Sequence, residues 1–208
     1  MKRFVITVAC LLAACAVPKG FTDRECEVIA SQSGAVMRLC RIGDRADSLF
    51  LRRKAAPLGA EELRSEYFRL LKQGMLLTVR DPADEGVGIA APQVGVLRRA
   101  VIVLETNVPD EKDEYMIELI NPVIVETAGE QVGAEGCLSV PDEYGIVARP
   151  DYVKVRAQDR HGEWFEVEGH GLTARAFCHE LDHLDGILFI DKATRMLAPE
   201  ELEQPSKR

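Results

Sequence analysis

The sequence predicts a domain that combines α-helices with a β-sheet, and three observations support this class. Apolar residues recur at helical spacing over residues 60–78. Four runs rich in β-branched residues follow between residues 98 and 169, each bounded by turn formers. A second helical pattern covers residues 173–186. Helical segments therefore flank a region of sheet strands.

The composition fits one globular domain with a single substantial core. The chain has 208 residues, of which 47% are hydrophobic and 29% are charged. Its net charge is −8 and no long Lys/Arg run interrupts the acidic balance, so a broad electrostatic grip on DNA is not expected. Small or peptidic partners fit this charge better, and we expect a monomer.

The first 36 residues differ in character from the rest. The basic start Met1-Lys2-Arg3 and the apolar run that follows are typical of a signal peptide, too short to span a membrane. The stretch "LAAC", which ends at Cys15, resembles the lipobox of bacterial lipoproteins, whose cysteine is acylated. Residues 1–36 are therefore expected to be a lipoprotein-type signal and linker, or an untranslated segment upstream of a start at Met37.

Residues 16–48 show no sustained periodicity, so they are expected to form a linker followed by an N-terminal arm. Six scattered cysteines predict free thiols rather than a disulfide framework. In an exported chain Cys26 and Cys40 could pair, although no spacing rule demands it.

The first regular element is a core-packing helix from Ala60 to about Thr78. Its apolar face is formed by residues at helical spacing, namely Leu63, Tyr67, Leu70, Leu71 and Met75. Closely spaced glycines then mark residues 80–96 as backbone that approaches another group closely. The strands expected next cover residues 98–105, 118–126, 151–159 and 163–169.

The last element is a helix that opens at Thr173 and ends before Gly186, and it carries the sequence "HELDH". His179 and His183 are four residues apart, so on a helix they share one face and can bind one metal ion. Glu180 lies one step round the helix, where a carboxylate can exchange a proton with water at the metal.

A catalytic metal ion usually has three protein ligands, and Cys137 in "EGCLSVP" is the best third candidate. Cys178 points about 100° away from His179 on a helix and is expected in the core or beside the site. A thiolate with two imidazoles accommodates Fe(II), Zn, Ni or Co, so the residues leave the metal undecided.

Three stretches in this order closely resemble the signature motifs of peptide deformylases: "GVGIAAPQ" (86–93), "EGCLS" (135–139) and "HELDH" (179–183). The resemblance extends over roughly residues 40–192. It implies removal of the formyl group from the N-terminal formyl-methionine of newly made bacterial polypeptides, with release of formate. It also implies an α+β fold in which antiparallel β-sheets pack around a central helix that carries the metal motif.

The resemblance also implies roles for individual residues. Cys137, His179 and His183 would bind the metal, usually Fe(II) in cells, and Glu180 would act as general base and then as acid. Gln93, through its side-chain amide, and Leu138, through its backbone N–H, would stabilise negative charge on the formyl oxygen. Gly88 would let the backbone approach the substrate. Val87 and Leu172 are candidates for an apolar methionine pocket, although core packing explains them equally well.

The domain boundaries expected from these features are 1–36 for the signal and linker, 37–195 for the catalytic domain and 196–208 for a short flexible tail. The tail is largely acidic, so it does not support docking to the ribosome through a basic C-terminal helix. Formylated nascent chains emerge in the cytoplasm, which is the expected location. Membrane anchoring through Cys15 is the alternative.

Two other functions stay open at this point. A metallopeptidase could use the same "HELDH" chemistry, although Cys137 and Gln93 favour a deformylase. An exported binding module would be consistent with the lipobox, but every residue needed for catalysis is present.

Overall fold

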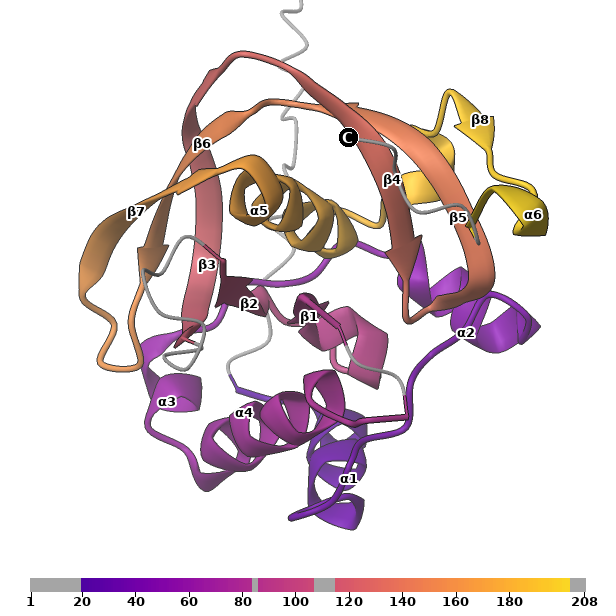
Figure 1. Ribbon diagram of the computed structural model, residues 1–208. Helices are drawn as coiled ribbons and strands as arrows, with labels where there is room; N and C mark the ends of the chain where they lie inside the picture. Colours follow the sequence, from indigo (N-terminus) through magenta and orange to yellow (C-terminus); the bar gives the residue numbers. More distant parts are fainter. Residues whose placement is uncertain (1–19, 84–85, 107–114, 203–208) are drawn as a thin grey trace, which may run out of the picture.

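The computed structural model describes residues 20–83, 86–106 and 115–202 (Figure 1). Its elements, in chain order, are α1 (Asp23–Ser31), α2 (Arg45–Leu51), α3 (Ala60–Leu63), α4 (Glu66–Val79), β1 (Gly88–Ala90), η1 (Ala91–Val94), β2 (Ala100–Glu105), β3 (Tyr115–Ala128), β4 (Gln131–Cys137), β5 (Val140–Arg149), β6 (Tyr152–Gln158), β7 (Trp164–His170), α5 (Gly171–Leu184), η3 (Phe189–Asp191), β8 (Arg195–Met196) and α6 (Pro199–Leu202).

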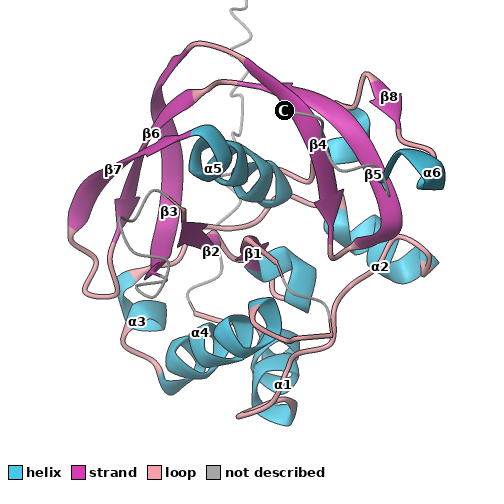
Figure 2. Cartoon of the chain, viewed as in Figure 1, coloured by secondary structure: helices cyan, strands magenta, loops and turns pink. Residues whose placement is uncertain are grey.

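The strands form two antiparallel sheets, which confirms the α+β class (Figure 2). One sheet has the order β1-β2-β3-β6-β7 and the other has the order β4-β5-β8. Helix α5 contacts strands of both sheets, among them β2, β7 and β5. Because one helix contacts both sheets, its side chains can meet groups from either sheet in one site.

Two apolar cores lie on either side of the larger sheet. The first is centred on Phe177 and Leu181 of α5, which pack against Val153 and Val155 of β6. The second joins α1 and α4 to β1 and β2, and Figure 1 shows these two helices together on one side of the molecule. Cys178 is buried in the first core, in agreement with the sequence prediction.

The helix expected over residues 60–78 is interrupted at Ser65. Ser65 is the N-cap of α4, because its Oγ accepts a hydrogen bond from Phe68 N. The segment therefore divides into α3 and α4. Phe68 is buried while Tyr67 is 38% exposed, so the predicted apolar face was wrong by one residue at its first turn. Leu71 and Met75 are buried as expected.

Residues 20–36 are not the irregular linker that their composition predicts. Thr22 and Glu25 form a capping box that begins α1. Glu25 and Ile29 are buried, and α1 packs on α4. The candidate lipobox at Cys15 lies outside the described residues.

Residues 195–202 also differ from the flexible tail expected after residue 195. They form β8 and α6, and β8 pairs with Gly145 and Ile146 of β5. Four described cysteines, Cys26, Cys40, Cys137 and Cys178, are free thiols. Within the described ranges there is no helix both long enough and apolar enough to cross a membrane.

Candidate metal and active site

The two histidines of α5 lie on consecutive turns and face the same side of the helix. Their ring centroids are 5.1 Å apart. His183 is 1% exposed, and burial lowers its pKa well below the usual value, which favours the neutral imidazole. A neutral imidazole is the form that binds a metal ion.

Cys137 approaches the two histidines from β4, in the three-stranded sheet. It ends β4, where the pairing with β5 shifts register after Gly136, and its Sγ lies 3.3 Å from His183 Nε2. One ligand atom from each of Cys137, His179 and His183 can be chosen so that all three lie within 4.8 Å of one another. This set of one thiol and two imidazoles fits a divalent metal ion with a fourth position left open. The structure thus brings the three predicted ligands together.

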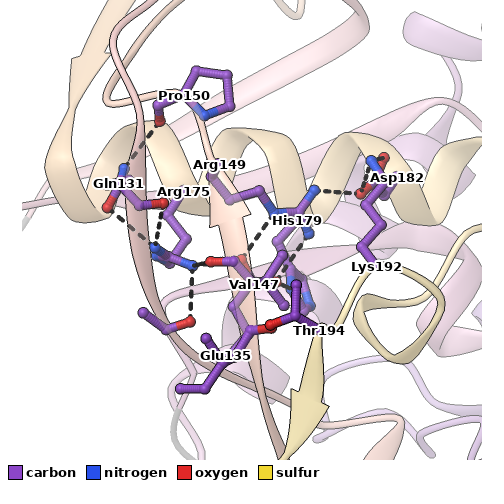
Figure 3. A network of polar contacts seen from close by, with 12 residues as sticks. Gln131, Glu135, Val147, Arg149, Pro150, Arg175, His179, Asp182, Lys192 and Thr194 are labelled. Carbon is purple, nitrogen blue, oxygen red and sulfur yellow. Dashed lines mark hydrogen bonds and ion pairs between the residues drawn. The ribbon is translucent and has the colours of Figure 1, made fainter.

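Glu135 orients the first histidine. Its Oε2 lies 3.0 Å from His179 Nδ1, which leaves Nε2 of that ring available for a metal ion. Arg149 donates to both carboxylate oxygens at 2.9 Å, and Arg175 donates to Oε1 at 2.9 Å (Figure 3). Burial alone would raise the pKa of Glu135, but the hydrogen bonds from Arg149 and His179 outweigh it and keep this pKa well below its usual range.

The network continues beyond the carboxylate. Arg149 donates to Asp182 on α5 at 2.6 Å, and Asp182 also accepts from Lys192 at 2.7 Å. The motif "EGCLS" contains Glu135, but its role was not predicted from the sequence, and neither were those of Arg149 and Arg175. The sequence signal for Arg175 was its position four residues before His179, which places both on one face of a helix.

Glu180 is buried beside the three candidate ligands. Glu180 is 3% exposed, and its Oε2 has no hydrogen-bond partner among the described residues. Burial raises the pKa of Glu180 to about 7, against the lowering effect of His179. A carboxyl group with such a pKa can both accept and return a proton near neutral pH.

At Gly88 the backbone approaches the Glu180 side chain closely, as the glycine-rich stretch predicts. A Cβ at this position would lie 2.7 Å from Glu180 Oε1, so no larger residue fits without displacing that carboxylate. β1 is the edge strand of its sheet, and Gly88 begins it.

Gln93 is buried in η1 with its amide aimed at the candidate ligands. Its Oε1 accepts from Ala90 N at 2.8 Å, which fixes the orientation of the amide. Its Nε2 lies 3.5 Å from Cys137 Sγ and 3.4 Å from Ser139 Oγ. Leu138 lies in the turn between β4 and β5.

These residues border a cavity of about 540 Å³, a size suited to a small ligand or a peptide end. The cavity is lined by residues 86–88, by residues 134–138 and 140–144, and by side chains of α5. Val87 and Leu172 both line it, and they are 40% and 48% exposed, which argues against a core role for either. Leu138 and Gln93 line the same cavity.

Comparison with known proteins identifies relatives over most of the chain. The polypeptide deformylase family model matches residues 36–198. The peptide deformylase of Thermoanaerobacter pseudethanolicus is 48% identical over 173 residues, covering 82% of this chain and 97% of the relative. That of Lachnoclostridium phytofermentans is 60% identical over 121 residues, covering 57% of this chain and 69% of the relative.

Solved structures resemble the fold as well. A class I type b peptide deformylase from Acinetobacter baumannii, determined with Met-Ala-Ser bound, has a TM-score of 0.66 and 38% identity, covering 76% of this chain and 98% of the other. The peptide deformylase from Thermotoga maritima has a TM-score of 0.65 and 33% identity, covering 77% of this chain and 99% of the other.

Proposed function

Because this chain belongs to the polypeptide deformylase family, we propose that the cluster of Cys137, His179, His183 and Glu180 is its reaction centre. The activity is that of a hydrolase that removes the formyl group from the N-terminus of polypeptides, and its substrates are peptides. The family depends on a metal ion.

The observation that carries the assignment is the set of three ligand atoms within 4.8 Å of one another, next to a buried carboxylate. Cys137 at the end of β4 would hold the metal ion together with His179 and His183 of α5. Fe(II) is the ion we expect in cells, with Zn, Ni or Co as alternatives. When bound, such an ion polarises the formyl carbonyl and lowers the pKa of water.

Glu180, Gln93 and Leu138 would carry out the proton transfer and the charge stabilisation. Glu180 takes a proton from the attacking water and returns it to the amine that leaves, which its pKa of about 7 permits. Gln93 Nε2 and the backbone N–H of Leu138 donate to the formyl oxygen as negative charge develops there. Removal of one such donor typically raises the barrier by about 2.7 to 4 kcal/mol.

The substrate main chain has two strand edges to pair with. β1 and β4 each lie at the end of their sheet, and residues of both line the cavity. A peptide can add to such an edge through backbone hydrogen bonds. We expect the methionine side chain to pack against Val87 and Leu172.

The setting of the reaction is also a proposal. Formylated nascent chains emerge in the cytoplasm, so we expect the enzyme to act there, as a monomer. The described part of the chain supplies no basic C-terminal helix for ribosome docking, and α6 carries Glu200 and Glu201.

The deciding experiment is formate release from formyl-Met-Ala-Ser by protein purified without oxygen and loaded with Fe(II) or Ni(II). The Glu180→Ala variant is the control, because it should keep its metal ion and lose most turnover. Rapid release that the variant lacks supports the assignment. A wild-type protein that binds metal and releases no formate would refute it, and loss of metal from Glu180→Ala would show that Glu180 is a ligand.

A further inference from the structure

The cavity continues away from the metal ligands along one face of α5. Leu172, Arg175, Ala176, His179 and Glu180 all line it, and their spacing places them on the same side of the helix. Each helical turn advances about 5.4 Å. Ala176 and Arg175 therefore lie one turn beyond the reacting end, which is where the substrate's methionine would lie if the formyl group meets His179 and Glu180.

Arg175 differs from the other α5 residues on this face because both of its guanidinium Nη atoms donate to β4. It donates to three residues of β4, namely Glu135 Oε1 at 2.9 Å, Gly133 O at 3.4 Å and Gln131 O at 3.4 Å. It also donates to Gln131 Oε1 at 3.4 Å and to Val147 O on β5 at 3.1 Å (Figure 3). Its side chain is only 9% exposed.

These contacts join α5 to β4, and residues of both elements line the cavity. β4 pairs with β5 alone in its sheet, so within the described residues its other edge has no strand beside it. The planar guanidinium bonds main-chain and side-chain acceptors along β4 at once, which the single ammonium of a lysine cannot reproduce. Arg175 thus holds β4 against α5 at several points along the strand, in addition to the single contact between Glu135 and His179.

We propose that Arg175 is a positioning residue that sets the distance between β4 and α5, and so the fit of the substrate's methionine. This inference rests on the proposed function. We expect Arg175 to act through β4 and not on the reacting atoms, because Glu135 has two further hydrogen bonds from Arg149 and a contact with His179 that do not involve Arg175.

The test is steady-state kinetics of metal-loaded Arg175→Lys on formyl-Met-Ala-Ser. We expect KM to rise roughly tenfold with kcat changed less than about twofold, the pattern of lost ground-state binding. We also expect the ratio of kcat/KM for formyl-Met-Ala-Ser over formyl-Phe-Ala-Ser to fall roughly tenfold, because a looser wall rejects a bulkier side chain less well. This ratio is independent of the fraction of protein that is folded.

The matched control is Arg149→Lys, the same substitution at the other arginine on Glu135. Arg149 does not line the cavity, and it holds Asp182 instead of β4 backbone. We expect it to lower metal retention and kcat while leaving the substrate ratio unchanged.

Other outcomes overturn the proposal. An unchanged KM and ratio in Arg175→Lys, or equal shifts of the ratio in both variants, would show that Arg175 has only a structural role. If Arg175→Lys does not fold, Arg175→Gln, which keeps a planar donor, must show the same KM and ratio changes. Absence of formate release by the wild-type protein would instead refute the proposed function, so the two failures are distinguishable.

Discussion

At the scale of single residues, Gly88 and Glu180 have to be considered together. The missing side chain of Gly88 leaves the space that Glu180 Oε1 occupies, since a Cβ there would lie 2.7 Å from that oxygen. Glu180 Oε2 is buried without a partner in the described structure, so few other contacts hold the carboxylate in place.

We expect Gly88→Ala to lower kcat about a hundredfold, because small displacements of a catalytic group have effects of this size. Metal content should be unchanged, since the three atoms nearest to an added Cβ all belong to Glu180 and none to a proposed ligand. Formate release at saturating substrate measures the effect. Gly86→Ala is the control, because its Cβ would meet Leu138 Cδ1 at 3.3 Å and not Glu180. Equal losses in the two variants would contradict this explanation.

The three proposed metal ligands could be predicted from the sequence, and the residues that hold them in place could not. Cys137, His179 and His183 carry a recognisable ligand pattern, and they meet as expected. Arg149 and Arg175 bind Glu135 from 14 and 40 positions away, and nothing local to either arginine indicates that pairing. Long-range ion pairs become visible only when the chain is folded.

At the scale of elements, the predictions succeeded where periodicity is strong. The segments expected for β2, β3, β6, β7 and α5 are all present. The β4–β5 hairpin was missed because "QVGAEGC" combines two glycines with a buried charge and lacks a clear alternation of apolar residues. The helix α1 was missed because its apolar face is short, although the capping box Thr22–Glu25 could have indicated its start.

The end of α5 provides a test at this scale. Gly186 follows the helix with φ of +75°, and a Cβ there would lie 2.4 Å from Arg52 O, just after α2. Gly162 has a similar φ of +87°, but its Cβ would meet nothing closer than 3.7 Å. Both alanine variants would carry the strain of a positive φ. Only the Cβ of Gly186→Ala would also clash with backbone atoms, those of Arg52.

We therefore expect Gly186→Ala to lower the free energy of unfolding by about 1 to 3 kcal/mol more than Gly162→Ala does, the usual cost of overpacking. Denaturant unfolding of the two variants gives the difference. If both lose the same stability, the contact between the end of α5 and Arg52 does not constrain this junction.

At the scale of the whole molecule, a buried ion cluster joins α1 to the domain. Arg98 is 2% exposed and donates to Glu25 Oε2 at 2.9 Å, to Glu62 Oε1 at 3.3 Å and to Gly20 O at 2.6 Å. A chain that began at Met37 would lack Glu25 and Gly20. It would also place a charged amino group where Met37 N, in a buried position, donates to Thr78 Oγ1 at 2.8 Å. We therefore expect residues 20–36 to be part of the folded domain.

The contribution of this cluster should depend on pH. Burial acts to raise the pKa of Glu25, but hydrogen bonds from Arg98 and Thr22 outweigh it, so the pKa lies below the usual value of 4.5. A carboxyl group whose pKa is lower in the folded state stabilises the fold above its unfolded pKa, and this stabilisation is lost as the pH falls through the folded pKa.

Glu25→Gln should therefore lower the free energy of unfolding by about 1.5 to 3 kcal/mol at pH 7, the usual value of a hydrogen bond to a charged group. The difference from the wild-type protein should shrink as the pH falls below 4.5, because the wild-type carboxylate is then being protonated. Urea unfolding between pH 7 and pH 3 measures both quantities. Glu27→Gln, at an exposed position of the same helix, should change little at any pH. A difference between Glu25→Gln and the wild-type protein that stays constant with pH would mean that the charge of Glu25 does not hold α1 in place.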